Sequence, residues 1–410
     1  MLILGFFVLL IFIYSLFAQR LEESIFTSPI IFTTVGIVLG TALPQPSIQV
    51  VTHEAALLVA EIALVLLLFT EASKVGLRSV EKALTLPTRL LGFALPLTIL
   101  LGAGTAALLL PELESFWEAA ILAVILAPTD AGLGQAIVEN KRVPSIIRRA
   151  LNVEAGLNDG LSIPFLTLFM ALALFENPLQ NNSFLQFLGE QVGFGVLVGM
   201  AIGYAGGWLV NWAKKREWIS STLAQLSLPA LAILAWLLAD MVGGNGFIAA
   251  FVAGLMVRVP YKNAQEHALE FSDASGQLLN LAVFFLFGII AAGQFRHFTP
   301  MLILYAVLSL TAVRMIPVAV SMLGMGLNRA TILFMGWFGP RGLASVVLAM
   351  VFLEQHATFA GEELIETAVF LTVLLSIYAH GFSALPGINW YTRRLAALDL
   401  SAPELKGQTI

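Results

Sequence analysis

Apolar residues in this chain form runs that are long enough to cross a lipid bilayer as helices. A hydrocarbon core of about 30 Å requires roughly 20 apolar residues per helix, and tilts or breaks change that length. Open strands cannot satisfy their backbone groups in lipid, so the pattern predicts an all-α polytopic membrane protein. We expect thirteen transmembrane segments, with approximate limits 1–18, 25–43, 54–73, 88–110, 116–139, 145–175, 184–212, 219–241, 244–259, 271–292, 300–324, 329–353 and 363–385.

Composition supports this class. Of the 410 residues, 59% are hydrophobic and only 11% are charged, whereas soluble domains carry about a quarter charged residues. A net charge of -5 excludes a nucleic-acid footprint, and the lack of cysteine excludes disulfides, thiolate chemistry and a cysteine-ligated metal. Met1 leads directly into an apolar run without a basic region or cleavage site, so we expect a retained first helix.

Basic residues in the loops predict the orientation of the chain. With the N-terminus outside and the C-terminus in the cytoplasm, the inner loops hold 18 of the 21 basic residues and the outer loops hold only Arg296. This asymmetry follows the positive-inside rule, and a segment more or less would destroy it. The inner set is Arg20, Lys74, Arg78, Lys82, Arg89, Lys141, Arg142, Arg148, Arg149, Lys214, Lys215, Arg216, Arg258, Lys262, Arg329, Arg393, Arg394 and Lys406.

Five charged residues lie deep within apolar segments: Asp130, Glu154, Asp159, Arg314 and Arg341. Ionisable groups at this depth are costly, and in membrane proteins they mark pairs or transport pathways. Their formal charges sum to -1, which leaves one negative charge for a mobile cation or a proton. The five histidines lie mostly near segment ends, have no metal-ligand spacing and are expected to be solvated.

Two segments carry a proline and glycines at their centre. The fifth reads I-L-A-P-T-D-A-G-L-G and the twelfth reads G-W-F-G-P-R-G-L-A-S, so each helix should break near Pro128 or Pro340. They are seven positions apart in the order of segments, an odd number, and therefore run in opposite directions. Such paired breaks are typical of transporters built from inverted repeats, although a single proline kink is common in any membrane helix.

Each break would expose one partly positive and one partly negative helix end inside the membrane. If the two helices cross, like ends meet and require opposite charges. Asp130 and Arg341 are the charged residues at the breaks. We expect them to act as these counter-charges, with Asp130 also facing a cation.

The stretch L-N-V-E-A-G-L-N-D-G, residues 151–160, follows the first break. At about 100° per residue, Asn152 and Asp159 share one helix face with Ala155 beside them. Glu154 and Asn158 share a second face. Glycines in the seventh segment favour close helix packing, either as a domain link or in a dimer contact; they are Gly193, Gly195, Gly199, Gly203, Gly206 and Gly207.

At these residues the chain resembles the monovalent cation/proton antiporter superfamily, in its NhaP-like branch related to the sodium/proton exchangers. The resemblance covers nearly the whole chain and rests on Thr129-Asp130, Glu154 with Asn158-Asp159, Arg314, and the G-P-R-G run around Arg341.

The resemblance implies that Asp159 binds the cation or the proton, with Asp130 beside it and Asn158 and the Thr129 carbonyl close by. It also implies a structural ion pair between Glu154 and Arg314. The pair Asn158-Asp159, in place of two aspartates, resembles the electroneutral branch of the superfamily rather than the electrogenic one. Close members carry serine after the glutamate as a ligand, where this chain has Ala155. Water or Asn158 would have to replace that hydroxyl.

The resemblance further implies a homodimeric antiporter in the cell inner membrane that exchanges Na⁺ or Li⁺ for H⁺ without a cofactor. Potassium remains an alternative cation. Two alternatives come from other classes: an enzyme, namely an intramembrane aspartyl protease, and a channel. The G-x-G-D signature of such proteases is absent from the sequence. The expected parts are a first repeat (1–175), a linker helix (184–212), a second repeat (219–385), a core subdomain (88–175 and 300–385) and a cytoplasmic tail (386–410).

Overall fold

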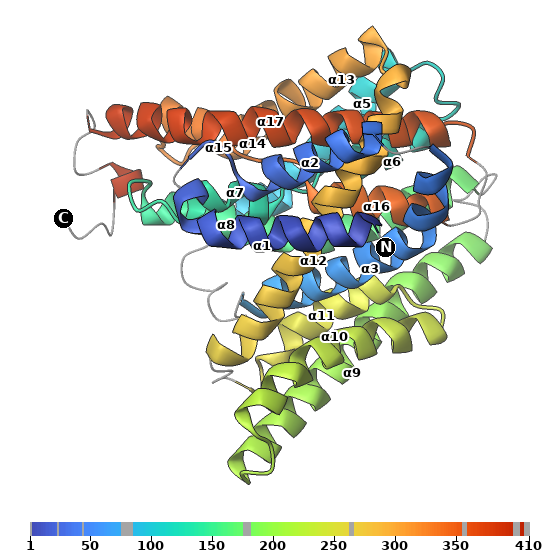
Figure 1. The fold of residues 1–410 in the computed structure, drawn as a ribbon, viewed down its shortest axis with the longest axis vertical. Coiled ribbons are helices and arrows are strands. Elements are labelled where there is room, and N and C mark those ends of the chain that lie inside the picture. The colour runs from blue at the N-terminus through green and yellow to red at the C-terminus, as the bar shows by residue number, and fades with distance from the viewer. Residues whose placement is uncertain are drawn as a thin grey trace. The chain divides into compact units, whose positions relative to one another are not determined.

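A computed structural model describes residues 2–22, 24–42, 45–74, 85–174, 182–261, 266–354, 359–396 and 402–405. These residues form helices and short connections, with no β-strand among them (Figure 1). Four basic residues used above to orient the chain (Arg78, Lys82, Lys262 and Lys406) lie outside the described residues. The prediction of an all-helical protein is confirmed.

The helices follow the apolar segments of the sequence. Their bounds are α1 (Leu2–Glu22), α2 (Ser28–Ala42), α3 (Gln45–Lys74), α4 (Thr85–Arg89), the π-helix η1 (Leu90–Ala94), α5 (Leu95–Leu109), α6 (Phe116–Ile125), α7 (Ala131–Val138), α8 (Ser145–Leu174), α9 (Asn182–Lys215), α10 (Ser221–Met241), α11 (Gly246–Val257), α12 (Glu266–Gln294), the 3₁₀ turn η3 (Phe295–His297), α13 (Pro300–Leu310), α14 (Ala312–Ser321), α15 (Arg329–Trp337), α16 (Leu343–Glu354), α17 (Glu362–Leu395) and the 3₁₀ turn η4 (Pro403–Leu405).

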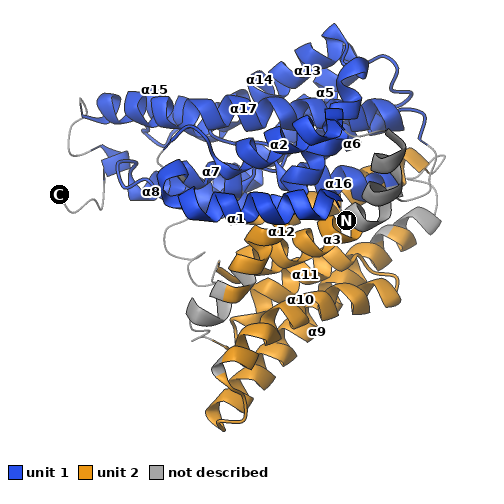
Figure 2. Ribbon diagram, viewed as in Figure 1, with its two compact units in different colours: residues 1–57, 86–155, 281–410 blue, residues 58–85, 156–280 orange. Residues whose placement is uncertain are grey.

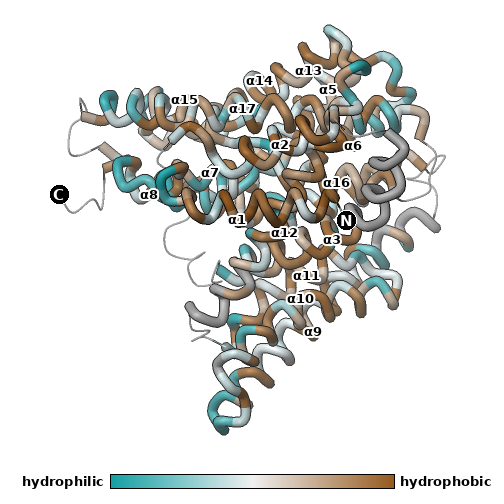
Figure 3. Tube along the Cα trace, in the orientation of Figure 1, coloured by the Kyte–Doolittle hydropathy of each residue, from teal (hydrophilic) through white to brown (hydrophobic). Residues whose placement is uncertain are grey.

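Most of these helices are apolar along their length. In the described part of the chain, eight are long and apolar enough to span a membrane, and four shorter apolar helices accompany them. Figure 3 shows the apolar positions running along the helices; α1 is apolar except in its last turn, which holds Arg20. The total of thirteen crossings stays a prediction, because several predicted segments are built from two shorter helices.

The chain divides into two compact units (Figure 2). Unit 1 comprises Met1–Leu57, Leu86–Ala155 and Leu281–Ile410, and unit 2 comprises Leu58–Thr85 and Gly156–Asn280. The boundary falls inside α8. The expected core and scaffold subdomains stay a prediction. The assignment of two inverted repeats stays a prediction.

Both predicted breaks are present. Helix α6 ends at Ile125 and α7 begins at Ala131, while α15 ends at Trp337 and α16 begins at Leu343. Pro128 and Pro340 lie within the extended connections, where their missing N–H groups interrupt the helical hydrogen bonds. The two connections meet, because the Asp130 amide donates to the Pro340 carbonyl over 2.8 Å.

A third interruption was not foreseen from the sequence. Thr311 separates α13 from α14 with φ -110° and ψ -94°, three residues before Arg314. No proline or glycine lies at this junction, so the local sequence carries no breaker signal there. Pro317, inside α14, removes the amide that would bond to Val313.

Unit 2 is held together by close contact between α9 and α11. An added Cβ at Gly195 or Gly199 would lie 2.8 or 2.5 Å from a backbone oxygen at or just before the start of α11. An added Cβ at Gly203 or Gly207 would be as close to the carbonyl of Ala253 or Val257. Spacing by four residues places these glycines on one face, which lets the backbones approach. The predicted close packing of this glycine-rich segment is confirmed within unit 2.

In unit 1, residues beyond α17 return to the start of α15. Glu404 is only 1% exposed, and its Oε1 accepts hydrogen bonds from the Asn328 amide at 2.5 Å and the Thr331 hydroxyl at 3.0 Å. The ring of Tyr391 stacks on Phe334 beside this contact, with centroids 4.2 Å apart. A carboxylate suits this position because the N-terminus of a helix is partly positive.

We predict that Glu404→Ala lowers the stability of the protein by about 1–3 kcal/mol, because it removes the acceptor of the Asn328 amide and of the buried Thr331 hydroxyl. Glu404→Gln, which keeps one acceptor oxygen, should lose less. Thermal unfolding of detergent-solubilised protein measures the difference. Glu363→Ala serves as the control, since the Glu363 side chain is 82% exposed; equal melting temperatures for the Glu404 and Glu363 variants would contradict this role.

Candidate functional site

Asp130 joins the two interrupted helices. Its Oδ1 accepts a hydrogen bond from the Leu133 amide and its Oδ2 accepts one from the Leu343 amide, each over 2.7 Å. The carboxylate therefore caps the N-termini of α7 and α16 together, where both helix dipoles favour negative charge. The structure places Asp130 at the two positive helix ends, with both oxygens engaged by backbone donors.

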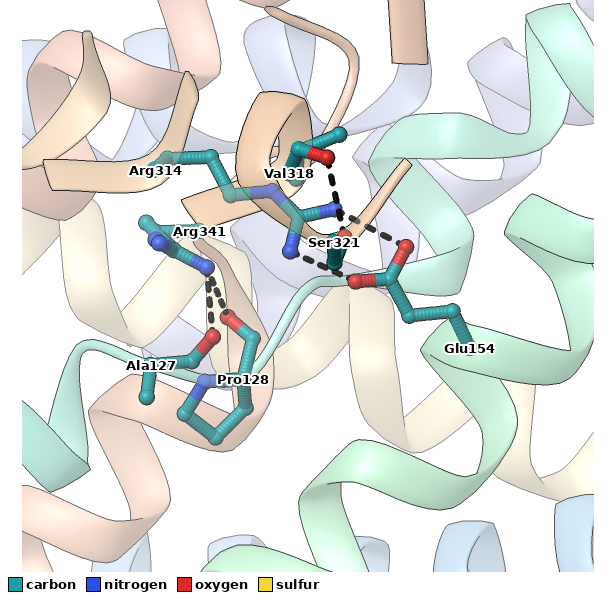
Figure 4. A network of polar contacts seen from close by, with 7 residues as sticks. All are labelled: Ala127, Pro128, Glu154, Arg314, Val318, Ser321 and Arg341. Atoms are coloured by element: carbon teal, nitrogen blue, oxygen red, sulfur yellow. Dashed lines mark hydrogen bonds and ion pairs between the residues drawn. The ribbon is translucent and has the colours of Figure 1, made fainter. Parts of the chain in front are cut away.

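Arg341 lies at the partly negative C-terminal end of the first interrupted helix. Its Nη1 donates to the carbonyls of Ala127 and Pro128, at 2.5 and 3.1 Å, just beyond the C-terminal end of α6 (Figure 4). The side chain is 0% exposed, and its own amide donates to the Ser376 hydroxyl over 2.6 Å. A fixed positive charge thus faces carbonyl groups that the break in the helix leaves without their usual partners.

Glu154 and Arg314 form a buried bidentate pair. Nη1 lies 2.5 Å from Oε1 and Nη2 lies 2.8 Å from Oε2, and each side chain is 2% exposed (Figure 4). Arginine matches a carboxylate with two parallel hydrogen bonds, which a lysine cannot do. The pair links α8 to α14 within unit 1.

The two glycines of the G-P-R-G run make room for these charges. A Cβ at Gly339 would lie 2.5 Å from Nε of Arg314, and a Cβ at Gly342 would overlap the Asp130 carboxylate. Any larger residue would have to displace a buried charged group. The run is therefore required by the site as well as by the break in the helix.

His380 corrects one expectation from the sequence. The prediction that the histidines are solvated is wrong for this residue, which is 2% exposed in the middle of α17. Its Nε2 lies 2.9 Å from the Trp337 carbonyl at the end of α15, and its Nδ1 lies 3.1 Å from the Ser376 hydroxyl. Ser376 and His380, four residues apart on one helix, could have been paired from the sequence.

The remaining predicted residues are also buried. Thr129 is 3% exposed in the break before α7, while Asn158 and Asp159 are 1% and 7% exposed in α8. Thr129 belongs to unit 1, whereas Asn158 and Asp159 belong to unit 2. A shared cation site of Asp130 and Asp159 therefore stays a proposal.

Glu71 adds an unforeseen carboxylate in unit 2. An added Cβ at Gly156 would lie 3.1 Å from its Oε2, and its Oε1 binds the Lys74 ammonium at 2.8 Å. Gly156 lies in α8 three residues before Asp159. The sequence placed Glu71 near the end of a segment and gave no signal that it approaches α8.

A small cavity of about 10 Å³, room for about one water molecule, lies beside the break in unit 1. Among its lining residues are Thr129, Asp130, Asn152, Glu154 and Ala155. Across the described side chains, no group of three or more histidine, cysteine or acidic residues could hold a resident metal ion.

Interrupted helices with a buried acid at the N-termini of α7 and α16 and a buried base at the C-terminal end of α6 are typical of the core of a helical secondary transporter. The model of a family described as "Sodium/hydrogen exchanger, transmembrane" matches residues 6–390. The chain therefore belongs to the sodium/hydrogen exchanger family.

Similar proteins agree with this assignment. The chain is 24% identical to a K(+)/H(+) antiporter NhaP of Alkalimonas amylolytica over 99% of this chain and 68% of the relative. It is 27% identical to a Na(+)/H(+) antiporter of Schizosaccharomyces pombe over 71% of this chain and 68% of the relative. The solved sodium proton antiporter MjNhaP1 of Methanocaldococcus jannaschii has the same fold, with a TM-score of 0.75, 18% identity and coverage of 97% and 99% of the two chains.

We predict that Arg314→Ala sharply reduces the amount of folded protein, because it leaves Glu154 as an uncompensated buried charge at a cost of about 3–5 kcal/mol. The double variant Glu154→Gln/Arg314→Gln should recover part of this loss. Size-exclusion chromatography after membrane extraction measures the yield. Arg296→Ala, at an exposed arginine, is the control; a well-folded Arg314→Ala protein would show that the pair has no structural role.

Gly342→Ala should displace the Asp130 carboxylate from the Leu343 amide and lower the melting temperature, with a loss of about 1–3 kcal/mol for the overpacked site. Gly134→Ala is the matched control, because a Cβ at Gly134 meets nothing within 4 Å. Thermal unfolding of both purified variants compares the two. Equal stability would mean that Asp130 does not require its place between the helix ends.

Proposed function

We propose that this protein exchanges Na⁺ or Li⁺ for H⁺ across a membrane by alternating access, with one buried acidic site that the cation and the proton occupy in turn. Family membership and the interrupted helices support this function. The observation that carries it is the charge of the five described residues that lie near the middle of the predicted apolar segments: Asp130, Glu154 and Asp159 against Arg314 and Arg341 sum to -1.

We infer different roles for these charges. Arg314 is engaged with Glu154, and Arg341 with the carbonyl end of α6. Asp130 caps two helices, so in this proposal it fixes the electrostatic field of the site and contacts the cation only through its remaining lone pairs. Asp159 is the residue that binds the cation or the proton, assisted by Asn158 and the Thr129 carbonyl.

Competition for one carboxylate is sufficient for exchange. When Na⁺ leaves on one side, a proton takes its place and is released on the other side. For a one-for-one electroneutral exchange, one unit of pH difference, worth about 1.4 kcal/mol, sustains roughly a tenfold ion gradient. No cofactor is needed, because the pH difference supplies the free energy.

Further parts of the proposal come from the family resemblance. The protein is a homodimer in the cell inner membrane, its N-terminus is outside and its C-terminus is cytoplasmic. The core moves like an elevator past a more rigid scaffold. Crosslinking in membranes tests the dimer, and accessibility of engineered terminal cysteines tests the orientation.

Potassium is a second candidate cation. Several of the similar proteins are named K(+)/H(+) antiporters, and Ala155 supplies no hydroxyl to a small cation. Exchange measured separately with Na⁺, Li⁺ and K⁺ decides between them. A channel would give cation flux without proton movement, and a protease would give no coupled flux.

We predict that Asp159→Asn abolishes exchange in proteoliposomes under an imposed pH difference with the voltage clamped, because the neutral amide can neither attract the cation nor carry the proton. Internal pH, followed by a fluorescent dye, is the readout. Asp240→Asn is the control, since Asp240 is an exposed carboxylate at the end of α10. Exchange that persists in Asp159→Asn would remove this residue from the mechanism.

A further inference from the structure

The small cavity beside the first break is lined by one polar residue, Asn152, that has no role in the proposed mechanism. On one side lie Thr129 and Asp130 from the connection between α6 and α7, and on the other side lie Asn152, Glu154 and Ala155 from α8. All of these residues belong to unit 1. The cavity therefore brings together polar groups of two segments within one compact unit.

Most polar atoms around this cavity are already engaged. Both oxygens of Asp130 accept backbone hydrogen bonds, and both oxygens of Glu154 bind Arg314. Asn152 differs, because its side chain is exposed and no described residue forms a hydrogen bond with its carboxamide. It is thus a neutral oxygen donor that lines the cavity and remains accessible from outside it.

The position of Asn152 on α8 gives this oxygen a specific use. Ala155 lies nearly one turn further along the same helix face and presents only a methyl group to the cavity. Asp159 lies seven residues beyond Asn152, two turns along the same continuous helix. Along this helix face, Asn152 offers a side-chain oxygen and Ala155 offers none.

We propose that Asn152 is a specificity-determining residue of the cation path: its Oδ1 contacts the monovalent cation, or the last water that the cation retains, beside Thr129 and Asp130. This assignment rests on the proposed function. Oxygen atoms are the preferred ligands of hard cations, and a neutral carboxamide adds an oxygen without adding charge.

The assignment makes a defined kinetic prediction. Asn152→Ala should raise the apparent KM for Na⁺ about tenfold, the effect of one lost contact to a charged group. The maximal rate should change little, because the proton-carrying carboxylate is untouched. The ratio of Na⁺, Li⁺ and K⁺ exchange should also change, because the contribution of one oxygen ligand depends on ion size.

Ala155→Ser supplies the decisive comparison. In the Asn152→Ala background, the added hydroxyl should restore most of the lost affinity, whereas in the wild-type background it should have a small effect. Asn152→Ser, with a shorter side chain and one oxygen, should be intermediate. Val153→Ala is the matched control, because Val153 neighbours Asn152 in α8 but does not line the cavity.

Two measurements on each variant separate this assignment from the proposed function. Cation-dependent thermal stabilisation of the purified protein reports binding of Na⁺, and proteoliposome assays report exchange. If the wild-type protein binds Na⁺ but does not exchange it, the proposed function is refuted. The role of Asn152 in cation binding would still stand if the Asn152 variants bind Na⁺ more weakly. Unchanged KM, selectivity and binding in a folded Asn152→Ala protein would overturn the assignment, as would equal effects of Ala155→Ser in both backgrounds. A wild-type protein that neither binds nor exchanges cations would overturn both.

Discussion

The crossing of two interrupted helices depends on the neutralisation of their ends. Each break leaves backbone donors and acceptors without helical partners in a region that water does not freely reach, and unsatisfied groups there cost several kcal/mol each. One carboxylate, Asp130, satisfies two helix N-termini, and one guanidinium, Arg341, satisfies carbonyls at the opposite end. The two breaks therefore depend on these two charged residues, which satisfy the backbone groups that each break exposes.

Other features of unit 1 keep these two charges in place. Gly339 and Gly342 leave the space that the buried groups require, and the bidentate pair of Glu154 and Arg314 joins α8 to the region of the second break. Ser376 and His380 contact the second break from α17. In the proposed mechanism, these fixed and compensated charges let Asp159 bind the cation or the proton while they keep their own positions.

The proposed roles of Asp130 and Asn152 refine the simplest view of such a site, in which every acid binds the ion. Asp130 is placed as a structural counter-charge whose field acts on the cation, while Asn152 is placed as a neutral ligand on its path. This division separates affinity from proton coupling. It also explains how the chain could retain cation selectivity with alanine at position 155.

The sequence by itself determined the class of protein, both breaks, and the charges that face them, because apolar length, proline and intramembrane charge are local signals that the bilayer makes strict. It gave no sign of the interruption at Thr311, the return of Glu404 to α15, or the approach of Glu71 to Gly156, and the burial of His380 went against the expectation that the histidines are solvated. Those features depend on which helices become neighbours. Tertiary structure alone decided them, since a polar side chain is buried or exposed according to partners that lie far away in the chain.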